Sequence, residues 1–306
     1  MKAEEAKALV DQGVQQLLED PEQWRRWAAT LSRFHRYSPG NVLLILSQRP
    51  DATYVAGYHA WQALGRQVQR GEHGITILAP VTRRPPPEAE AATDAEASAE
   101  RARKAPVVVG FRAVTVFDVS QTAGRPLQIP EPQLLDGDTL AHLLPHLAQA
   151  VGVPVQFVPE LAGGANGTYD TTARAIAVAT AGRTADQQVK TLLHEWAHHA
   201  GNRGPGAVDP APWLHRGAEE IAAETTAWVV AKRLGLDTRA YSLPYVGHWA
   251  QGDPAQVTAV MQEVATRVRA IADTLDQAAE RDPLLAQAWP GALQAALAQE
   301  VEAEMG

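Results

Sequence analysis

The segment VKTLLHEWAHHAG carries two histidines four residues apart, His194 and His198, and Glu195 directly follows the first of them. Residues four apart on an α-helix lie on the same face, so both imidazoles can reach one metal ion. The flanking residues are uncharged and largely apolar, as a buried active-site helix requires, and we expect Gly201 to end this helix. The pattern predicts a zinc site at which Glu195 is the general base.

The later segment GAEEIAAETTAWVV supplies carboxylates at helical spacing, because Glu220 and Glu224 are four residues apart and share a face. The chain has no cysteine, so a carboxylate is the natural third ligand beside two histidines. We predict that Glu220 is this ligand and that Glu224 accepts a hydrogen bond from a ligand histidine, with the reverse assignment as the alternative. Glu219 is expected to be solvated, and His199 is not expected to be a ligand.

This site predicts a zinc-dependent metallo-endopeptidase of the gluzincin type. Zinc polarises a scissile carbonyl and lowers the pKa of water, while Glu195 takes the proton of the water and passes it to the leaving amine. A further donor must stabilise the oxyanion. The candidates for that donor are Tyr241, Tyr245, His215 and His248.

Apolar periodicity indicates which elements position these residues. Four helices are predicted in the first part of the chain, over residues 3–20, 21–34, 42–48 and 58–64. Asp20 and Asn41 are the expected N-caps of the second and third helices. The stretch GRQVQRGEHGITILAPV alternates around Gly71 to Gly74 and predicts a β-hairpin. Two further strands are predicted at 53–55 and 107–119.

The rest of the chain is predicted to be mainly helical. Strands are expected at 155–158 and 175–178, and helices over residues 140–151, 185–201, 217–235, 254–281 and 284–304. The fold class is therefore α+β with two domains. Residues 1–125 form a small α+β domain with a flexible insertion at 85–105, residues 126–138 form a linker, and residues 139–306 form a mainly helical domain with a small sheet.

Composition and charge limit the classes of protein that fit. Apolar residues make up 45% and charged residues 20% of the chain, as in ordinary globular proteins. No run of 18 uncharged apolar residues and no secretory signal is present, so we expect a cytoplasmic protein without membrane spans. The net charge is −8, yet residues 24–84 contain nine arginines and only two acids. On charge alone, this segment is either a solvated basic face or a nucleic-acid-binding surface.

Several segments between residues 24 and 251 occur together in the order and spacing of a known family. The first part contains FHRYSPGNVLLILSQRP, YHAWQALGRQVQRGEHGITILAPV and FRAVTVFDVSQTAGRPL, and the second contains NGTYDTTARAIAV, TLLHEWAHH, EEIAAETTAWVVAKRLGLDTRAYS and YVGHWA. With these segments the chain resembles the ArdC-like antirestriction proteins. The resemblance implies an N-terminal single-stranded-DNA-binding domain followed by a zincin metallopeptidase domain of the ImmA/IrrE-like kind. The lysines of the family's KGEKG-like turn are replaced here by Arg70 and His73.

The resemblance also implies that single-stranded DNA is bound without strong sequence preference. Single strands are held by cations that follow the phosphates and by aromatic faces on which bases stack. The candidate residues are Arg66, Arg70, His73, Tyr54, Tyr58, Trp61, Arg33 and Arg36, and His35 lies beside the last two. Trp61 has a helical spacing from Leu64, which is more typical of a core residue.

Three functions remain compatible with the sequence. The first is a zinc metallopeptidase that cleaves a protein near single-stranded DNA, or a protein that protects incoming DNA. The second is a non-catalytic DNA-binding protein with a structural zinc. The third is an IrrE-like regulatory protease that cleaves a repressor. Glu195 favours the first and third, because a structural site needs no general base, whereas the basic segment favours the first and second.

Overall fold

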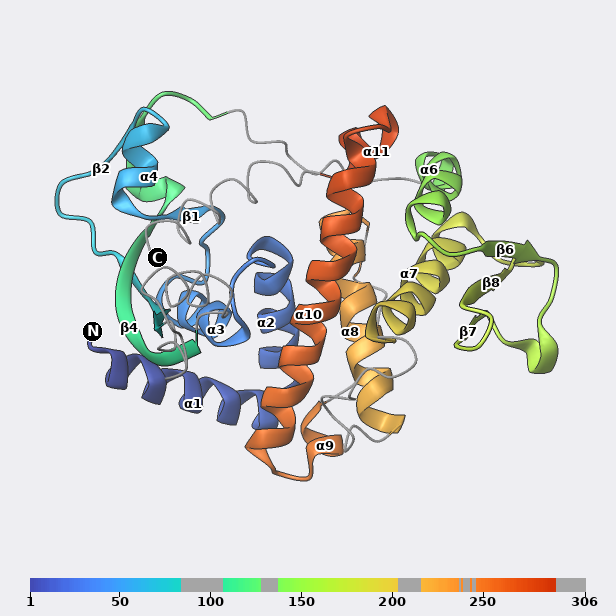
Figure 1. Cartoon of the computed structure of the whole chain (residues 1–306), viewed down its shortest axis with the longest axis horizontal. Coiled ribbons are helices and arrows are strands. Elements are labelled where there is room, and N and C mark those ends of the chain that lie inside the picture. Colours follow the sequence, from blue (N-terminus) through green and yellow to red (C-terminus); the bar gives the residue numbers. More distant parts are fainter. Residues whose placement is uncertain are drawn as a thin grey trace, which may run out of the picture.

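A computed structural model describes residues 1–83, 107–127, 137–202, 216–236 and 246–289, together with the single positions 238 and 243. The chain combines helices with small sheets whose strand pairs are mostly antiparallel, which confirms the predicted α+β class. Figure 1 shows the long helix α10 (Pro254–Ala279) between the N-terminal elements and the sheet β6–β8. Every helix within these residues is too short or too polar to cross a membrane.

Three helices open the chain: α1 (Ala3–Glu19), α2 (Pro21–Arg33) and α3 (Pro39–Gln48). The side chain of Asp20 accepts a hydrogen bond from the backbone of Glu22 and caps α2, as predicted. The predicted cap of α3 is wrong, because Ser38 caps that helix and Pro39 occupies its first turn. Asn41 is buried instead, and its amide group bonds the backbone N–H and C=O of Leu78 at 2.8 and 2.9 Å.

The strands of the N-terminal part pair in an order that the sequence did not reveal. β3 (Ile75–Arg83) pairs with β4 (Val107–Asp118), and β4 also pairs with β1 (Val55–Ala56). β2 (Arg66–Val68) pairs with β5 (Thr122–Gly124). The predicted hairpin around Gly71–Gly74 is therefore wrong, because its two strands join different sheets. The partners of β2 lie 54 to 58 residues further along the chain, and those of β3 lie 24 to 41 residues further along.

Short elements connect these strands and helices. α4 (Tyr58–Ala63) lies between β1 and β2, and the 3-10 helix η1 (Val119–Gln121) joins β4 to β5. Gly65 ends α4 with a φ of 73°, a left-handed conformation that glycine adopts without steric cost.

The second part of the chain contains a small sheet and its covering helices. α6 (Gly137–Ala150) precedes β6 (Val155–Val158), and β8 (Ala175–Ala179) pairs parallel with β6 and antiparallel with β7 (Gly167–Asp170). The 3-10 helix η2 (Ala162–Gly164) leads into β7, a strand that is not among those predicted from the sequence. The remaining helices are α7 (Ala185–Gly201), α8 (Arg216–Arg233), α9 (Val246–Ala250), α10 and α11 (Pro283–Ala288).

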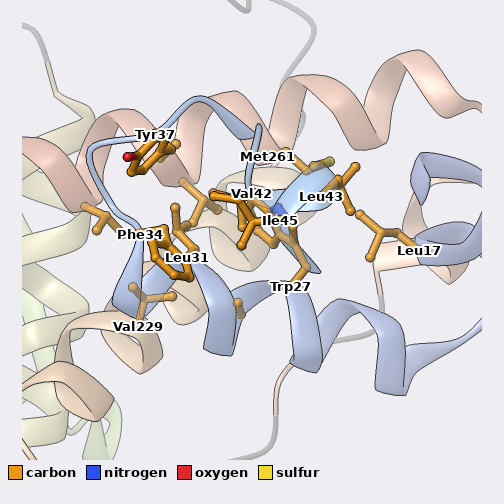
Figure 2. Close-up of a cluster of buried hydrophobic side chains, with 14 of the residues drawn as sticks. Leu17, Trp27, Leu31, Phe34, Tyr37, Val42, Leu43, Ile45, Val229 and Met261 are labelled. Carbon is orange, nitrogen blue, oxygen red and sulfur yellow. The ribbon is translucent and has the colours of Figure 1, made fainter. Parts of the chain in front are cut away.

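One hydrophobic core is shared by the two predicted domains. Trp27, Leu31 and Phe34 of the N-terminal part pack in the same cluster as Val229 of α8 and Met261 of α10, as Figure 2 shows. A second cluster lies between α6, the sheet β6–β8 and helices α7, α8, α10 and α11. Helices α8 and α10 contribute to both clusters, so these helices join the two parts.

Several predictions concern residues outside the described part of the chain. These are the insertion at 85–105, most of the linker at 126–138 and most of the helix predicted at 284–304. The predicted oxyanion donors Tyr241 and Tyr245 and the residue His215 also lie outside it, as does the side chain of His248.

Candidate metal centre

Three side chains converge from two neighbouring helices. Thr184 caps α7, because its hydroxyl accepts a hydrogen bond from the backbone of Gln187. Successive turns of this helix carry His194 and His198 on one face. The Nε2 atoms of these histidines are 3.1 Å apart. Glu220 of α8 places Oε2 at 3.6 Å from Nε2 of His194 and at 3.8 Å from Nε2 of His198. One ligand atom from each residue lies within 4.8 Å of the others, so the three can hold a metal ion.

The separation of the donor atoms fits a small divalent cation. Bonds of about 2.0–2.2 Å in a tetrahedron place neighbouring ligand atoms roughly 3.3 Å apart, and the three separations bracket this value. Two imidazoles and one carboxylate are a ligand set of zinc enzymes that leaves one position open. The residues present therefore fit a zinc ion.

The outer nitrogens of the two histidines face further carboxylates. Nδ1 of His198 lies 3.1 Å from Oε1 of Glu219, and Nδ1 of His194 lies 3.6 Å from Glu224. The second separation exceeds a hydrogen bond, and Nδ1 of His194 has no partner among the described residues. Glu224 therefore faces the outer nitrogen of His194, a candidate ligand, without forming the predicted hydrogen bond. Glu219 is closer to the other histidine, and its predicted solvation is wrong.

Partners hold Glu219 in its ionised form. Burial by itself would raise the pKa of this carboxyl group, but hydrogen bonds from His198 and Arg267 outweigh burial and lower the pKa to about 2. Burial also opposes the charged form of His198, yet Glu219 and Glu220 raise the pKa of that imidazole. The pKa of His194 is lowered, first by burial and then by the neighbouring His198. The two imidazoles shift in opposite directions, and His198 is the one with a carboxylate at hydrogen-bond distance.

Glu195 has the burial and the environment of a general base. The side chain is 8% exposed. Burial, reinforced by Glu220 and Glu224, raises its pKa to about 7, although His198 and the backbone N–H of Tyr169 act in the opposite direction. A carboxyl group with a pKa near neutrality can both accept and return a proton.

A cleft of about 720 Å³ opens beside Glu195. It is lined by Asn166 and Gly167 from the start of β7, by Gly182 and Arg183, and by Lys190 and His194 on α7. β7 lies at the end of the strand order β6-β8-β7, so its outer edge has no strand partner among the described residues. His199 faces away from the candidate ligands and lies 3.1 Å from the hydroxyl of Tyr169, as expected for a residue that is not a ligand.

Three of the residues predicted to bind DNA are instead buried or paired with other residues of the protein. Trp61 is 0% exposed and donates from Nε1 to the carbonyl of Phe117 at 2.8 Å, so its ring is core and cannot stack on a base. Arg36 forms ion pairs with Asp273 and Asp276 of α10. His35 is also 0% exposed. These three assignments are corrected, because tertiary contacts that the sequence did not show bury or neutralise the side chains.

The other DNA-binding candidates differ in exposure. Arg66 is half-buried and donates to Thr122 and to the carbonyl of Arg125 on the next strand. Arg33 and Tyr54 are also half-buried. The exposed candidates are Arg70 and His73 in the loop between β2 and β3, and Tyr58 at the start of α4. This exposed group stays a prediction.

Sequence reasoning missed Glu219, Arg267 and Gly167. The pair Glu263 and Arg267 has the i,i+4 spacing that could have marked a helical ion pair, but nothing in the sequence showed that α10 packs against α7 and α8.

The chain is similar in sequence and fold to antirestriction proteins. Residues 3–117 match the model of the N-terminal domain of anti-restriction factor ArdC. The chain covers 98% of the metal-free crystal structure of the antirestriction protein ArdC from plasmid R388, with 89% of its own length aligned, 18% identity and a TM-score of 0.55. A Mn(II)-bound structure of the same protein aligns over 78% of this chain and 84% of that chain, with 21% identity and a TM-score of 0.45. An uncharacterized Bacillus anthracis protein, pXO2-81, is 24% identical over 81% of this chain, and the chain spans about half, 47%, of that relative's length.

Proposed function

Since residues 3–117 form the N-terminal domain of an ArdC-like protein, we propose that the chain is a zinc-dependent metallopeptidase that binds single-stranded DNA. It cleaves protein substrates near single-stranded DNA or in response to it, or it protects incoming DNA. The single observation that carries the peptidase proposal is the convergence of His194, His198 and Glu220, with Glu195 buried beside them.

The roles of the residues follow from their places. His194, His198 and Glu220 would hold zinc, which supplies a Lewis acid for a scissile carbonyl and lowers the pKa of water. Glu195 accepts a proton from the attacking water and delivers it to the leaving amine. The backbone N–H of Tyr169 holds the carboxylate of Glu195 in place. Burial keeps the pKa of Glu195 near neutrality, which suits both transfers.

The shape of the cleft supports an extended peptide as substrate. The unpaired edge of β7 runs into the cleft at Asn166 and Gly167. An extended chain can add to such an edge through backbone hydrogen bonds, which depend little on sequence. A peptide bond lying there would be next to Glu195, because Glu195 lines the same cleft.

Single-stranded DNA is the proposed partner of the N-terminal part. Arg70 and His73 are exposed in the loop that follows β2. Tyr58 is 39% exposed and accepts a hydrogen bond from Gln67 of β2. A cation and an exposed aromatic ring are the groups that hold phosphate and base in sequence-tolerant binding.

Casein cleavage tests the peptidase proposal. The protein is incubated with zinc, with and without single-stranded DNA, and casein fragments and self-cleavage are followed by gel. We expect cleavage by the parent protein and a loss of about 10²–10⁴-fold in Glu195→Gln, which removes the base and leaves the three ligands in place. The matched control is Glu160→Gln, an exposed carboxylate outside the cleft. Zinc bound by both proteins without cleavage by either would favour a structural metal and contradict the peptidase proposal.

DNA binding is tested separately by fluorescence anisotropy with a labelled oligonucleotide. Arg70→Ala is expected to weaken binding and to lower the slope of log affinity against log salt by about 1, because one phosphate contact is lost. Arg281→Ala, an exposed arginine in the C-terminal part, serves as the control. Equal affinities and equal slopes for the two variants would remove Arg70 from the DNA-binding surface.

A further inference from the structure

Arg267 of α10 lies buried between two carboxylates next to the candidate metal centre. The residue is 2% exposed. Nε donates to Glu263 on the same helix at 3.0 Å. Nη1 and Nη2 donate to the two oxygens of Glu219 at 2.9 and 2.5 Å, so the pair is bidentate. Arginine fixes a carboxylate in one plane in this arrangement, which a lysine cannot do.

Glu219 connects this arginine to the histidine. Its Oε1 faces both Nη1 of Arg267 and Nδ1 of His198, the latter at 3.1 Å. When Nδ1 carries the proton, the lone pair of Nε2 remains free on the side of His194 and Glu220. The contact thus sets both the ring orientation and the tautomer that a cation needs.

Gly201, the last residue of α7, has no side chain and so leaves room for the guanidinium of Arg267. A Cβ on Gly201 would lie 2.5 Å from Cζ, 2.5 Å from Nη2 and 2.8 Å from Nε of Arg267. These separations are shorter than van der Waals contacts, so any other residue would displace the guanidinium. Because Arg267 is held by carboxylates on both sides, it cannot move away without breaking a buried ion pair.

We propose that Gly201, Arg267 and Glu219 are positioning residues for cation binding, which together orient His198 as a ligand. Gly201 admits the guanidinium of Arg267, Arg267 fixes Glu219, and Glu219 accepts the Nδ1 proton of His198. The inference rests on the metal site of the proposed function. An ion pair that only stabilised helix packing would not need to share Oε1 with an imidazole.

The test measures zinc affinity of metal-free protein by competition with a chromophoric chelator. Glu219→Gln keeps the shape of the side chain but removes its charge, and Gly201→Ala displaces Arg267. Both are expected to weaken zinc binding by about 10–100-fold, the usual effect of losing a group behind a ligand. Gly40→Ala is the glycine control, since a Cβ there meets only Val10 at 3.5 Å, and Glu160→Gln is the carboxylate control, because Glu160 is exposed and lies outside the cleft. Both controls should bind zinc like the parent.

A second readout separates positioning from packing. Two-bond ¹H–¹⁵N correlation of metal-free protein at alkaline pH reports the imidazole tautomer. We expect the Nδ1–H tautomer for His198 in the parent and a shift toward Nε2–H in Glu219→Gln, while melting temperatures establish that each variant is folded. If one variant fails to fold, the other decides.

The outcomes distinguish the inference from the proposed function. If the parent binds zinc, His194→Ala loses it, and Glu219→Gln and Gly201→Ala bind as tightly as the parent, the positioning role is wrong and the metal site stands. If the parent and His194→Ala bind zinc equally, the proposed site itself is wrong.

Discussion

At the residue scale, the same kind of side chain takes opposite roles according to its surroundings. Glu195 and Glu219 are both partly buried near His198, yet the pKa of Glu195 is raised to about 7 and that of Glu219 is lowered to about 2. Burial raises the pKa in both cases. The difference comes from the partners, because Glu219 receives hydrogen bonds from His198 and Arg267, whereas Glu195 lies near the acidic Glu220 and Glu224.

His35 allows a prediction about pH and stability. Its ring is 0% exposed, neither ring nitrogen has a hydrogen-bond partner among the described residues, and Arg233, Arg36 and Arg269 lie around it. Burial and then these arginines hold its pKa well below the ordinary value. The unfolded chain therefore binds a proton near pH 6.5 that the folded chain rejects. The free energy of unfolding therefore has its full value above about pH 6.5. Below that pH it falls by up to about 1.4 kcal/mol per pH unit.

His35→Leu should remove this loss of stability in acid. Leucine leaves no polar atom to desolvate, so the variant is expected to be about as stable as the parent near neutrality and more stable below about pH 6. Urea unfolding at several pH values measures the difference. His59→Gln, an exposed histidine of α4, should keep the pH profile of the parent. Parallel profiles for the parent and His35→Leu would show that another group controls acid unfolding.

At the element scale, β7 matters because its backbone packs directly against α7. A Cβ on Gly167 would lie 2.4 Å from Cγ2 of Thr191 and 2.8 Å from Oε1 of Glu195. Only glycine allows this approach between a strand and a helix. The strand thus contacts Glu195, the proposed general base, directly, although the sequence did not predict β7.

Gly167→Ala should therefore impair catalysis more than folding. The new methyl group displaces Glu195, and a shift of about 1 Å at a catalytic group can cost roughly 10²-fold in rate. Casein cleavage under zinc saturation measures the effect, and circular dichroism measures the fold. Gly110→Ala in β4 is the matched control, since a Cβ there meets nothing within 4 Å. Full activity in Gly167→Ala would mean that Glu195 can be displaced without consequence, against the assigned role.

At the scale of the whole molecule, the N-terminal elements pack against helices that also form the candidate metal centre or lie next to it. Trp24 of α2 donates to Thr225 of α8 at 3.3 Å, Arg233 of α8 donates to the carbonyl of Ser32 at 3.1 Å, and Arg36 binds the acids of α10. The first hydrophobic cluster crosses the same boundary (Figure 2). We therefore expect the described parts to unfold together.

Calorimetry tests this expectation. A single transition is predicted, and zinc at 100 times its Kd should stabilise the folded chain by about 2.7 kcal/mol. Hydrogen exchange should then slow in α2 as well as in α7, although α2 contributes no ligand. Two transitions, of which only one responds to zinc, would show that the domains predicted at 1–125 and 139–306 are independent.

Local chemistry sufficed to predict much of this protein from its sequence. The spacing of His194 and His198, the later carboxylate Glu220, the cap at Asp20 and the limits of β6 and α7 all depend on helical or strand geometry within a few residues. The likeness to the ArdC N-terminal domain was also readable from the order of its segments.

The tertiary structure alone decided which distant groups meet. It paired β2 with β5 rather than with β3, buried Trp61 and His35, and assigned Arg36 to α10 instead of a DNA surface. It also brought Arg267 beside Glu219, forty-eight residues earlier in the chain. Strand pairing and buried ion pairs depend on contacts between distant segments, and no local pattern of residue types records which segments will pack together.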